Sequence, residues 1–293
     1  MKKTKLPIIR WIILAISALL INSYISGWLY KPHLYTGKLK AIILPVLNCY
    51  ACPGAFPSCP IGTIQHFMVI KFVPLLTLGI LIILGALVGR LFCGWACPFG
   101  LFQELLHKIP TPKLSMPRWM RFGKYLFLII TVFVVPYIIT DTFFCKLCPQ
   151  GALEGGIPQM LLKPELRHLA GWLYWTKIAI LTITIFLVIF IKRFFCRAIC
   201  PLGAFLAIFN KISIVQMKVN ISQCTQCKLC KKVCPVDINI YEDPNSPECI
   251  RCGLCIGCLN GVKYSTIFSS EPTVKPQQIE QNPPKIPEIN NCD

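Results

Sequence analysis

Charged residues are scarce in this chain, and acidic residues are the scarcest of them. Asp, Glu, Lys and Arg make up 14% of the sequence, against about a quarter in a typical soluble domain. Hydrophobic residues make up 55%, and 12 acidic residues stand against 30 basic ones. This composition excludes an ordinary soluble domain, and we expect an integral membrane protein with one small soluble module.

Several common binding motifs are also absent from the sequence. It contains neither a P-loop nor a G-x-G-x-x-G run after a predicted strand, so nucleotide binding has no support. It has no Cys-x-x-Cys-His, so covalent c-type haem has no support either. The net charge of +18 does not indicate nucleic-acid binding, because the basic residues crowd the ends of apolar segments, as orientation in a lipid membrane requires.

Four apolar segments are long enough to cross a membrane, at roughly 20 residues each. They cover about residues 11–30, 72–91, 125–144 and 172–191. The most basic parts of the chain are the N-terminus, the connection from Arg90 to Lys124, and the stretch after Lys192. Because basic loops stay in the cytoplasm, we expect a multi-pass protein of a bacterial or archaeal cytoplasmic membrane, with both termini cytoplasmic.

Cysteine, by contrast, is abundant, with 18 residues. One run reads C-x2-C-x2-C-x3-C-P and ends at Pro235, and a second reads C-x2-C-x2-C-x2-C and ends at Cys258. The first is the pattern of a bacterial two-cluster ferredoxin, in which the fourth cysteine ligates the other cluster. The sequence therefore predicts two [4Fe–4S] clusters. Their predicted ligands are Cys224, Cys227, Cys230 and Cys258 for one, and Cys249, Cys252, Cys255 and Cys234 for the other.

The second run is one residue shorter than the pattern. Only two residues separate Cys255 from Cys258, which shifts Cys258 by about a third of a helical turn. A pair of structural zinc sites is the alternative, because four thiolates also suit zinc. Zinc motifs usually pair two C-x2-C halves, so four successive cysteines in each run favour iron–sulfur clusters. Such cysteines must stay reduced, which also favours a cytoplasmic module.

An internal repeat surrounds four further cysteines. The motif Arg-x2-Cys-x3-Cys-Pro-x-Gly begins at Arg90 and again at Arg193, an offset of 103 residues. Duplicated halves usually pack about a pseudo-two-fold axis, which would bring the four cysteines together. Because proline favours the first turn of a helix, Cys97 and Cys200 are expected near N-caps, where the helix dipole favours thiolate. The alternative is structural packing. The predicted ligands of a redox or metal site on the inner membrane face are Cys93, Cys97, Cys196 and Cys200.

Five more cysteines fall in the loops on the opposite side. They are Cys49, Cys52, Cys59, Cys145 and Cys148. Cys49-x2-Cys52-Pro resembles Cys145-x2-Cys148-Pro, and Cys59 begins another Cys-Pro-x-Gly. Three interpretations stay open for this outer face: a metal or cluster site, a redox dithiol pair, or plain disulfides.

The ordered set of cysteines resembles the NapH/NosR/CcoG group of membrane polyferredoxins over residues from about 70 to 260. The resemblance implies a membrane protein that passes electrons between cytoplasmic 4Fe–4S clusters and the quinone pool, or a membrane or periplasmic redox partner. It implies a subunit of a quinol dehydrogenase-like oxidoreductase rather than a free-standing enzyme. The chain departs from the group in its outer-face cysteines and in lacking the large periplasmic flavin domain of NosR.

We therefore expect an all-α membrane domain over residues 1–215, with four transmembrane helices in lipid and a two-fold internal repeat. An α+β bacterial 2[4Fe–4S] ferredoxin-like domain should follow over 216–270, and a disordered tail over 271–293. Clusters on the two membrane faces would lie up to about 30 Å apart. Either the inner cysteines sit deep in the membrane, or a quinone, or a flavin or haem on a partner subunit, would have to bridge that gap. One or two further clusters in the membrane domain stay open. Two other functions stay open: a membrane thiol–disulfide reductase, and a reductant-delivery or maturation factor for a metalloenzyme.

Overall fold

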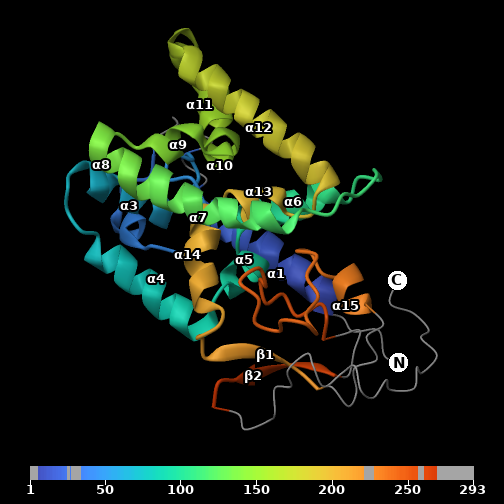
Figure 1. Ribbon diagram of the computed structural model, residues 1–293. Helices are drawn as coiled ribbons and strands as arrows, with labels where there is room; N and C mark the ends of the chain where they lie inside the picture. Colours follow the sequence, from blue (N-terminus) through green and yellow to red (C-terminus); the bar gives the residue numbers. More distant parts are fainter. Residues whose placement is uncertain (1–5, 25–26, 28–33, 221–227, 257–260, 269–293) are drawn as a thin grey trace.

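The computed structural model describes residues 6–24, 27, 34–220, 228–256 and 261–268, and this part is mostly helical (Figure 1). The α-helices are α1 (Leu6–Ile21), α3 (Pro60–Val69), α4 (Leu75–Val88), α5 (Leu91–Trp95), α6 (Pro98–His107), α7 (Gly123–Phe127), α8 (Val135–Ile139), α9 (Phe143–Leu147), α10 (Pro149–Gly151), α11 (Ile157–Leu162), α12 (Trp172–Phe190), α13 (Phe194–Ala198), α14 (Pro201–Phe209) and α15 (Leu229–Lys232). Short 3-10 helices are η1 (Lys38–Ala41), η2 (Arg118–Phe122) and η5 (Pro164–Leu169). The segments η3 (Leu128–Val134) and η4 (Ala152–Gly156) are π-helical.

Among the described residues, two helices are long and apolar enough to cross a membrane. One is the continuous run of η2, α7, η3 and α8, with 22 residues, and the other is α12, with 19. The other two predicted segments form shorter helices, α1 with 16 residues and α4 with 14. At 1.5 Å per residue, α4 covers about 21 Å, which is less than the roughly 30 Å of a hydrocarbon layer.

Two of the helices are shorter than the segments predicted for them, and a local backbone feature explains each difference. The helix α4 begins after Pro74 and ends at Gly89, whose φ of +56° stops the helix. The segment predicted to reach residue 144 ends at Thr140, which adopts a left-handed conformation. The first helix begins earlier than predicted, at Leu6, and ends at Ile21. Residues 28–30, where that segment was predicted to end, lie outside the described residues.

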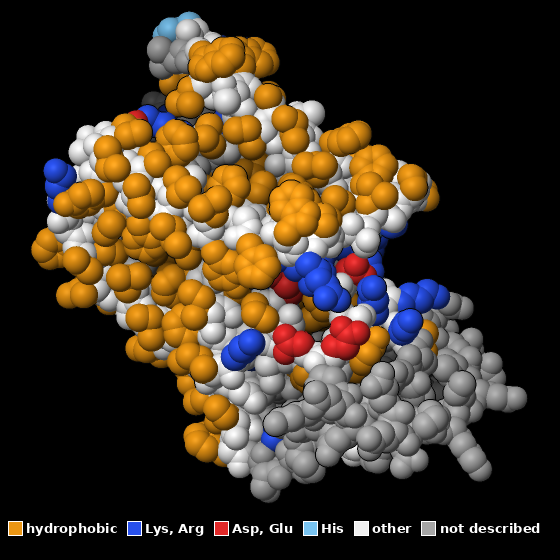
Figure 2. Space-filling view, viewed as in Figure 1, with side chains coloured by type: hydrophobic (Ala, Val, Ile, Leu, Met, Phe, Trp, Pro, Cys, Tyr) orange, Lys and Arg blue, Asp and Glu red, His pale blue; other side chains and the backbone are white. Residues whose placement is uncertain are grey.

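The helices carry apolar side chains outward and polar side chains inward. Leu76 and Ile138 are each 71% exposed, whereas Thr77, Thr131 and Thr184 are buried. Figure 2 shows hydrophobic side chains over much of the face formed by α4, α8 and α12. An apolar surface of this extent marks an interaction with lipid or with another apolar surface.

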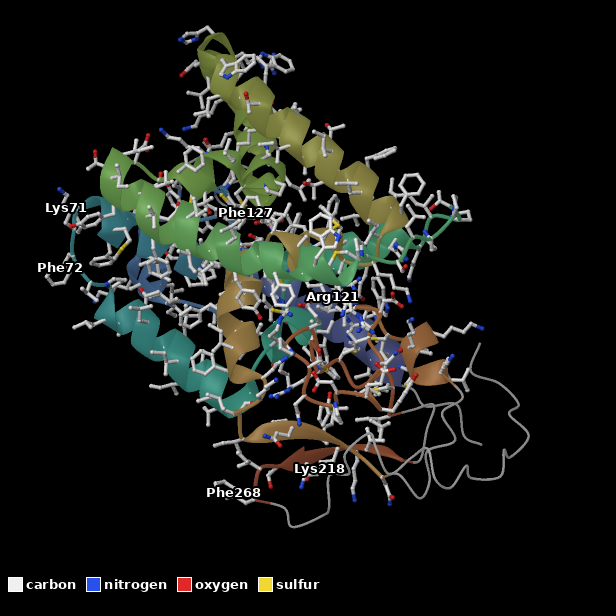
Figure 3. The ribbon with its side chains drawn as sticks, in the orientation of Figure 1. Lys71, Phe72, Arg121, Phe127, Lys218 and Phe268 are labelled. Atoms are coloured by element: carbon white, nitrogen blue, oxygen red, sulfur yellow. The ribbon has the colours of Figure 1, made fainter. Side chains whose placement is uncertain are left out.

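Cationic side chains lie at both ends of the helix over residues 118–139. Arg121 marks one end, and Lys71, in the bend after α3, lies beside the other (Figure 3). The ammonium group of Lys71 lies 5.6 Å from the ring centroid of Tyr137. Basic and aromatic side chains of this kind are typical anchors at a membrane–water interface.

The C-terminal unit is built on a small sheet. Strand β1 (Val215–Val219) pairs antiparallel with β2 (Val262–Thr266), from Val215 opposite Thr266 to Val219 opposite Val262. The C-terminal cysteine run lies between the two strands, and the short helix α15 follows Lys228. The buried side chains of the C-terminal unit belong to the same continuous core as those of the helical bundle. The unit therefore packs directly against the helices (Figure 1).

Candidate functional site

Five of the predicted ferredoxin ligands fall within the described residues; Cys224, Cys227 and Cys258 lie outside them. The structure places Cys234 among the thiols of the second run, with which it interacts electrostatically. These thiols line a small apolar cavity together with Val236, Ile238 and Ile250. Within the run, Gly253 has a φ of +76°, and a Cβ there would lie 2.9 Å from the Tyr264 hydroxyl. The loop therefore needs glycine at this position.

The cysteines of the internal repeat come together at the centre of the molecule. We call the following four residues the proximal site: Cys93 on α5, Cys97 before α6, Cys196 on α13 and Cys200 before α14. Their thiols lie close enough to interact electrostatically with one another. As predicted, Cys97 and Cys200 are N-caps followed by proline. The backbone N–H of Gly203 donates to Cys200 Sγ at 3.3 Å, and that of Gly100 donates to Cys97.

The expected thiolate character of the N-cap cysteines is wrong for the metal-free thiols. Burial, together with the neighbouring thiols Cys196 and Cys93, raises the pKa of Cys97 to about 12. Burial raises the pKa of Cys200 as well. The helix terminus and its N–H donors are therefore outweighed by desolvation of the charged form. A bound metal would have to displace these protons.

The two arginines of the repeat cross from one copy to the other. Arg90 Nη2 donates to the carbonyl oxygen of Cys196 at 3.2 Å, and Arg193 Nη1 donates to that of Cys93 at 2.6 Å. A Cβ on Gly203 would lie 3.1 Å from the Arg90 guanidinium, and one on Gly100 would lie 3.1 Å from that of Arg193. The repeated Arg, Cys and Gly therefore form one reciprocal contact.

Buried ion pairs surround the proximal site with excess positive charge. Glu104 pairs with both Arg193 and Arg10, at 2.7 and 2.6 Å. A second carboxylate, Glu248 of the C-terminal unit, pairs with Arg90 at 3.5 Å and with a lysine, Lys124. Each carboxylate is shared by two cations, so a net positive charge remains beside the thiols. Thiolates bound to a metal cluster would compensate this charge. Neither acid was predicted from the sequence, although only 12 of its residues are acidic.

The proximal site touches the C-terminal cysteine run. A Cβ on Gly94, next to Cys93, would lie 2.4 Å from the Ile250 carbonyl oxygen and 3.5 Å from Cys252 Cα. Trp95 Nε1 donates to the carbonyl oxygen of Arg251 at 3.0 Å, which fixes this loop to the first copy of the repeat.

The second copy of the repeat holds the same loop. Asn210, which follows α14, donates through Nδ2 to the Cys249 carbonyl oxygen at 2.7 Å. Arg251 Nη2 donates to the Asn210 carbonyl oxygen, also at 2.7 Å. The two cysteine sites are therefore direct neighbours, and both copies of the repeat position them.

The outer-face cysteines also gather, but not as their spacing indicated. Four of them line one cavity of about 610 Å³, and we call these four the distal site: Cys49, Cys59, Cys145 and Cys148. The counterpart of Cys148 is Cys59 and not Cys52, because a proline begins a helix directly after each of these two. Cys52 is buried in its own turn, where it accepts hydrogen bonds from the backbone N–H groups of Gly54 and Ala55.

The proximal and distal donor sets consist of cysteine thiols, the usual ligands of iron–sulfur clusters. Within the described ranges, no three His, Cys, Asp or Glu side chains surround one position for a metal ion. A tetrahedral zinc site holds its sulfur atoms at 2.3 Å and hence about 3.8 Å apart. A cube of four irons instead has its cysteine ligands at four separate corners.

Comparison with known proteins agrees with this chemistry. The family model described as a 4Fe-4S binding domain matches residues 70–117, 122–161 and 174–222. The matched segments contain the whole proximal site and two cysteines of the distal site, Cys145 and Cys148. No solved structure matches the chain.

Three curated relatives illustrate the similarity. The uncharacterized protein MJ0750 of Methanocaldococcus jannaschii is 34% identical over 215 residues, which cover 69% of this chain and 82% of that protein. The putative electron transport protein YccM of Escherichia coli is 25% identical over 60% of this chain and 50% of its own length. The ferredoxin-type protein NapH of Haemophilus influenzae is 25% identical over 87% of each chain. These matches confirm the resemblance to ferredoxin-type proteins, and the chain belongs to the 4Fe-4S binding domain family.

Proposed function

We propose that this chain is an integral membrane protein that passes electrons between 4Fe–4S clusters in its C-terminal unit and the quinone pool or a redox partner. The family and the relatives support electron transport by a 4Fe–4S protein. One observation carries the finer proposal: the loop with Cys252 lies directly against the helix with Cys93. A donor site and an acceptor site in contact are what outer-sphere electron transfer requires.

The proposed membrane crossings are α1, α4, the helix over 118–139 and α12. The two longer helices meet the length requirement, and the outward apolar side chains of all four support the assignment. The reciprocal contacts of Arg90 and Arg193 support an approximate two-fold relation between the halves. Both termini and the C-terminal unit are proposed to lie in the cytoplasm, on the basic side of the membrane.

The chain itself supplies ligands, burial and charge. Bound clusters would supply one-electron chemistry, held by the cysteines of the C-terminal run and by the four proximal thiols. Around the proximal site, Arg90 and Arg193 would favour the more negative, reduced state of any such group, because both cations are buried and close. The nearby carboxylates limit this effect by sharing each cation.

Serine substitutions at the proximal site test the proposal. The variants Cys93→Ser and Cys200→Ser are purified without oxygen, reconstituted into vesicles, and compared for iron content, EPR spectra and quinone reduction. We expect loss of about four irons per chain, unchanged signals from the C-terminal clusters, and no transfer to quinone. The matched control is Cys52→Ser, another buried cysteine outside both sites. Full quinone-linked turnover in the two proximal variants would disprove the proposed route.

A further inference from the structure

The distal site is built from two stretches of the chain, residues 49–59 and 145–148. Cys59 and Cys148 cap the helices that begin at Pro60 and Pro149, Cys145 lies on α9, and Cys49 lies in the loop that precedes them. The backbone N–H of Cys145 donates to Gln65 Oε1 at 3.2 Å, which fixes α9 beside α3. A Cβ on Gly62 would lie 3.6 Å from Cys145 Sγ and 3.9 Å from Cys59 Cβ, so these two cysteines are neighbours.

The distal site repeats the local chemistry of the proximal site. The backbone N–H of Gly62 donates to the Cys59 thiol, and that of Gly151 donates to the Cys148 thiol. These are the contacts that Cys97 and Cys200 receive from the corresponding glycines of the proximal site. The chain therefore forms the same Cys-Pro-x-Gly cap four times, twice in each site.

A cation points into the distal site. Lys177 on α12 interacts electrostatically with the thiols of Cys49, Cys145 and Cys148. A Cβ on Gly151 would lie 3.1 Å from Lys177 Nζ and 3.6 Å from Cys49 Sγ. Within the described residues, Lys177 forms no hydrogen bond or ion pair. An ionisable side chain on a membrane helix normally marks a functional site and has a partner.

Disulfide bonds would not provide that partner. All four distal cysteines are free thiols. A disulfide carries no charge and would not compensate the Lys177 ammonium. The nearby acid Glu154, whose Oε2 accepts a hydrogen bond from the Cys49 N–H at 3.0 Å, forms no ion pair with Lys177 within the described residues. A disulfide also draws its two sulfur atoms to about 2.05 Å, whereas these thiols line a cavity of about 610 Å³. An anionic group that uses several thiolates fits the charge and the space.

We propose that Cys49, Cys59, Cys145 and Cys148 bind a [4Fe–4S] cluster beside Lys177, adjacent to the proximal site. The two sites share a short piece of backbone: the N–H of Leu47 donates to the Cys97 thiol, and the N–H of Asn48 donates to the Cys59 thiol. Consecutive Cα atoms are 3.80 Å apart. Leu47 and Asn48 are 3% and 1% exposed, so this piece of backbone is buried between the two sites.

This arrangement removes the gap expected between the membrane faces. Clusters on opposite faces would lie up to about 30 Å apart, but the buried segment that contains Leu47 brings the proximal and distal sites next to each other. An electron passing between them oxidises one site and reduces the other, and no bond or proton moves. The inference rests on the proposed function and extends its route to the side of the molecule away from the C-terminal unit.

Iron content tests the distal site directly. The full chain is purified in detergent without oxygen as wild type, Cys59→Ser, Cys145→Ser and Cys52→Ser, and iron and acid-labile sulfide are measured per chain. We expect Cys59→Ser and Cys145→Ser to lose about four irons each, and Cys52→Ser to lose none. Unchanged iron in the first two variants, or an equal loss in Cys52→Ser, would overturn the proposal. So would a disulfide between distal cysteines in the wild-type protein.

A charge variant keeps the proposal testable if the serine variants fold poorly. Lys177→Gln retains all the ligands, so iron should stay at the wild-type level, while the midpoint potential of one EPR-active cluster should fall. A potential unchanged for every cluster would count against the site. The proposed function fails independently if quinone-linked turnover survives loss of the proximal site. The distal proposal fails alone if the proximal variants behave as expected and the distal variants keep their iron.

Discussion

Replacing Gly94 with alanine should separate the C-terminal cysteine run from the proximal site. The new Cβ would lie 2.4 Å from the Ile250 carbonyl oxygen, well inside van der Waals contact, and this oxygen belongs to backbone that cannot rotate away. Overpacking of this kind costs about 1–3 kcal/mol. Gly94 lies in a helix, where alanine is more stable than glycine by roughly 0.5–1 kcal/mol, so this gain offsets part of the cost.

The matched control is Gly79→Ala on α4, where an added Cβ has open space within 4 Å. We expect Gly94→Ala to be less stable than Gly79→Ala by about 1–3 kcal/mol, which lowers Tm by about 2–4 °C per kcal/mol in a chain of this size. Thermal unfolding in detergent, followed by cluster absorbance, measures the difference. Stopped-flow reoxidation of the C-terminal clusters by quinone should also slow, with iron content unchanged. If both variants show the same Tm and the same rate, Gly94 does not pack closely against the Ile250 carbonyl oxygen in the protein.

Two further predictions concern the buried carboxylates. Glu248→Gln leaves Arg90 and Lys124 without their shared anion, which should lower the free energy of unfolding by about 3–5 kcal/mol. The C-terminal unit should then become more sensitive to limited proteolysis. The control is Glu242→Gln, at an exposed position, which should match wild type. Burial alone would raise the pKa of Glu104, but Arg193 and Arg10 outweigh it and hold that pKa below the usual value. The ionised form therefore adds stability at neutral pH that is lost as the pH falls through the lowered pKa, and Glu104→Gln should flatten that acid limb of a Tm–pH profile. An acid limb identical to that of wild type would refute this role of Glu104.

Local chemistry made the proximal site predictable from the sequence. Proline at the first helical position fixes Cys97 and Cys200 as N-caps. The arginine and the glycine keep the same spacing in both copies of the repeat because the arginine of each copy packs against the glycine of the other. These features depend on neighbours within a few residues and on an exact repeat. The protonation of the thiols could not be predicted in the same way, because burial depends on the whole fold and outweighs the helix terminus.

The distal site was predictable only in part. Its cysteines were identified, but their grouping was not, because Cys52 and Cys59 are each followed by proline and only Cys59 is followed by a helix. Lys177 appeared in the sequence as an ordinary residue at the start of a predicted membrane segment. Its direction depends on how α12 packs against α10, which no local pattern encodes. The length of α4 was overestimated because the sequence stays hydrophobic on both sides of the helix. The helical backbone itself begins after Pro74 and stops before Gly89.

The two copies of the repeat differ in the source of their counter-charge, and this difference explains how the C-terminal unit is held. In the first copy, Glu104 on α6 neutralises Arg193 across the repeat. The corresponding residue of the second copy, 103 positions later, is Ala207, which has no charge to offer Arg90. Glu248 of the C-terminal unit supplies the missing carboxylate. A buried cation without its partner is strongly destabilising, so docking of the C-terminal unit gives Arg90 the counter-ion that its own repeat lacks. The same ion pair that stabilises the fold therefore fixes Cys249 and Cys252 beside Cys93, where electrons would have to pass.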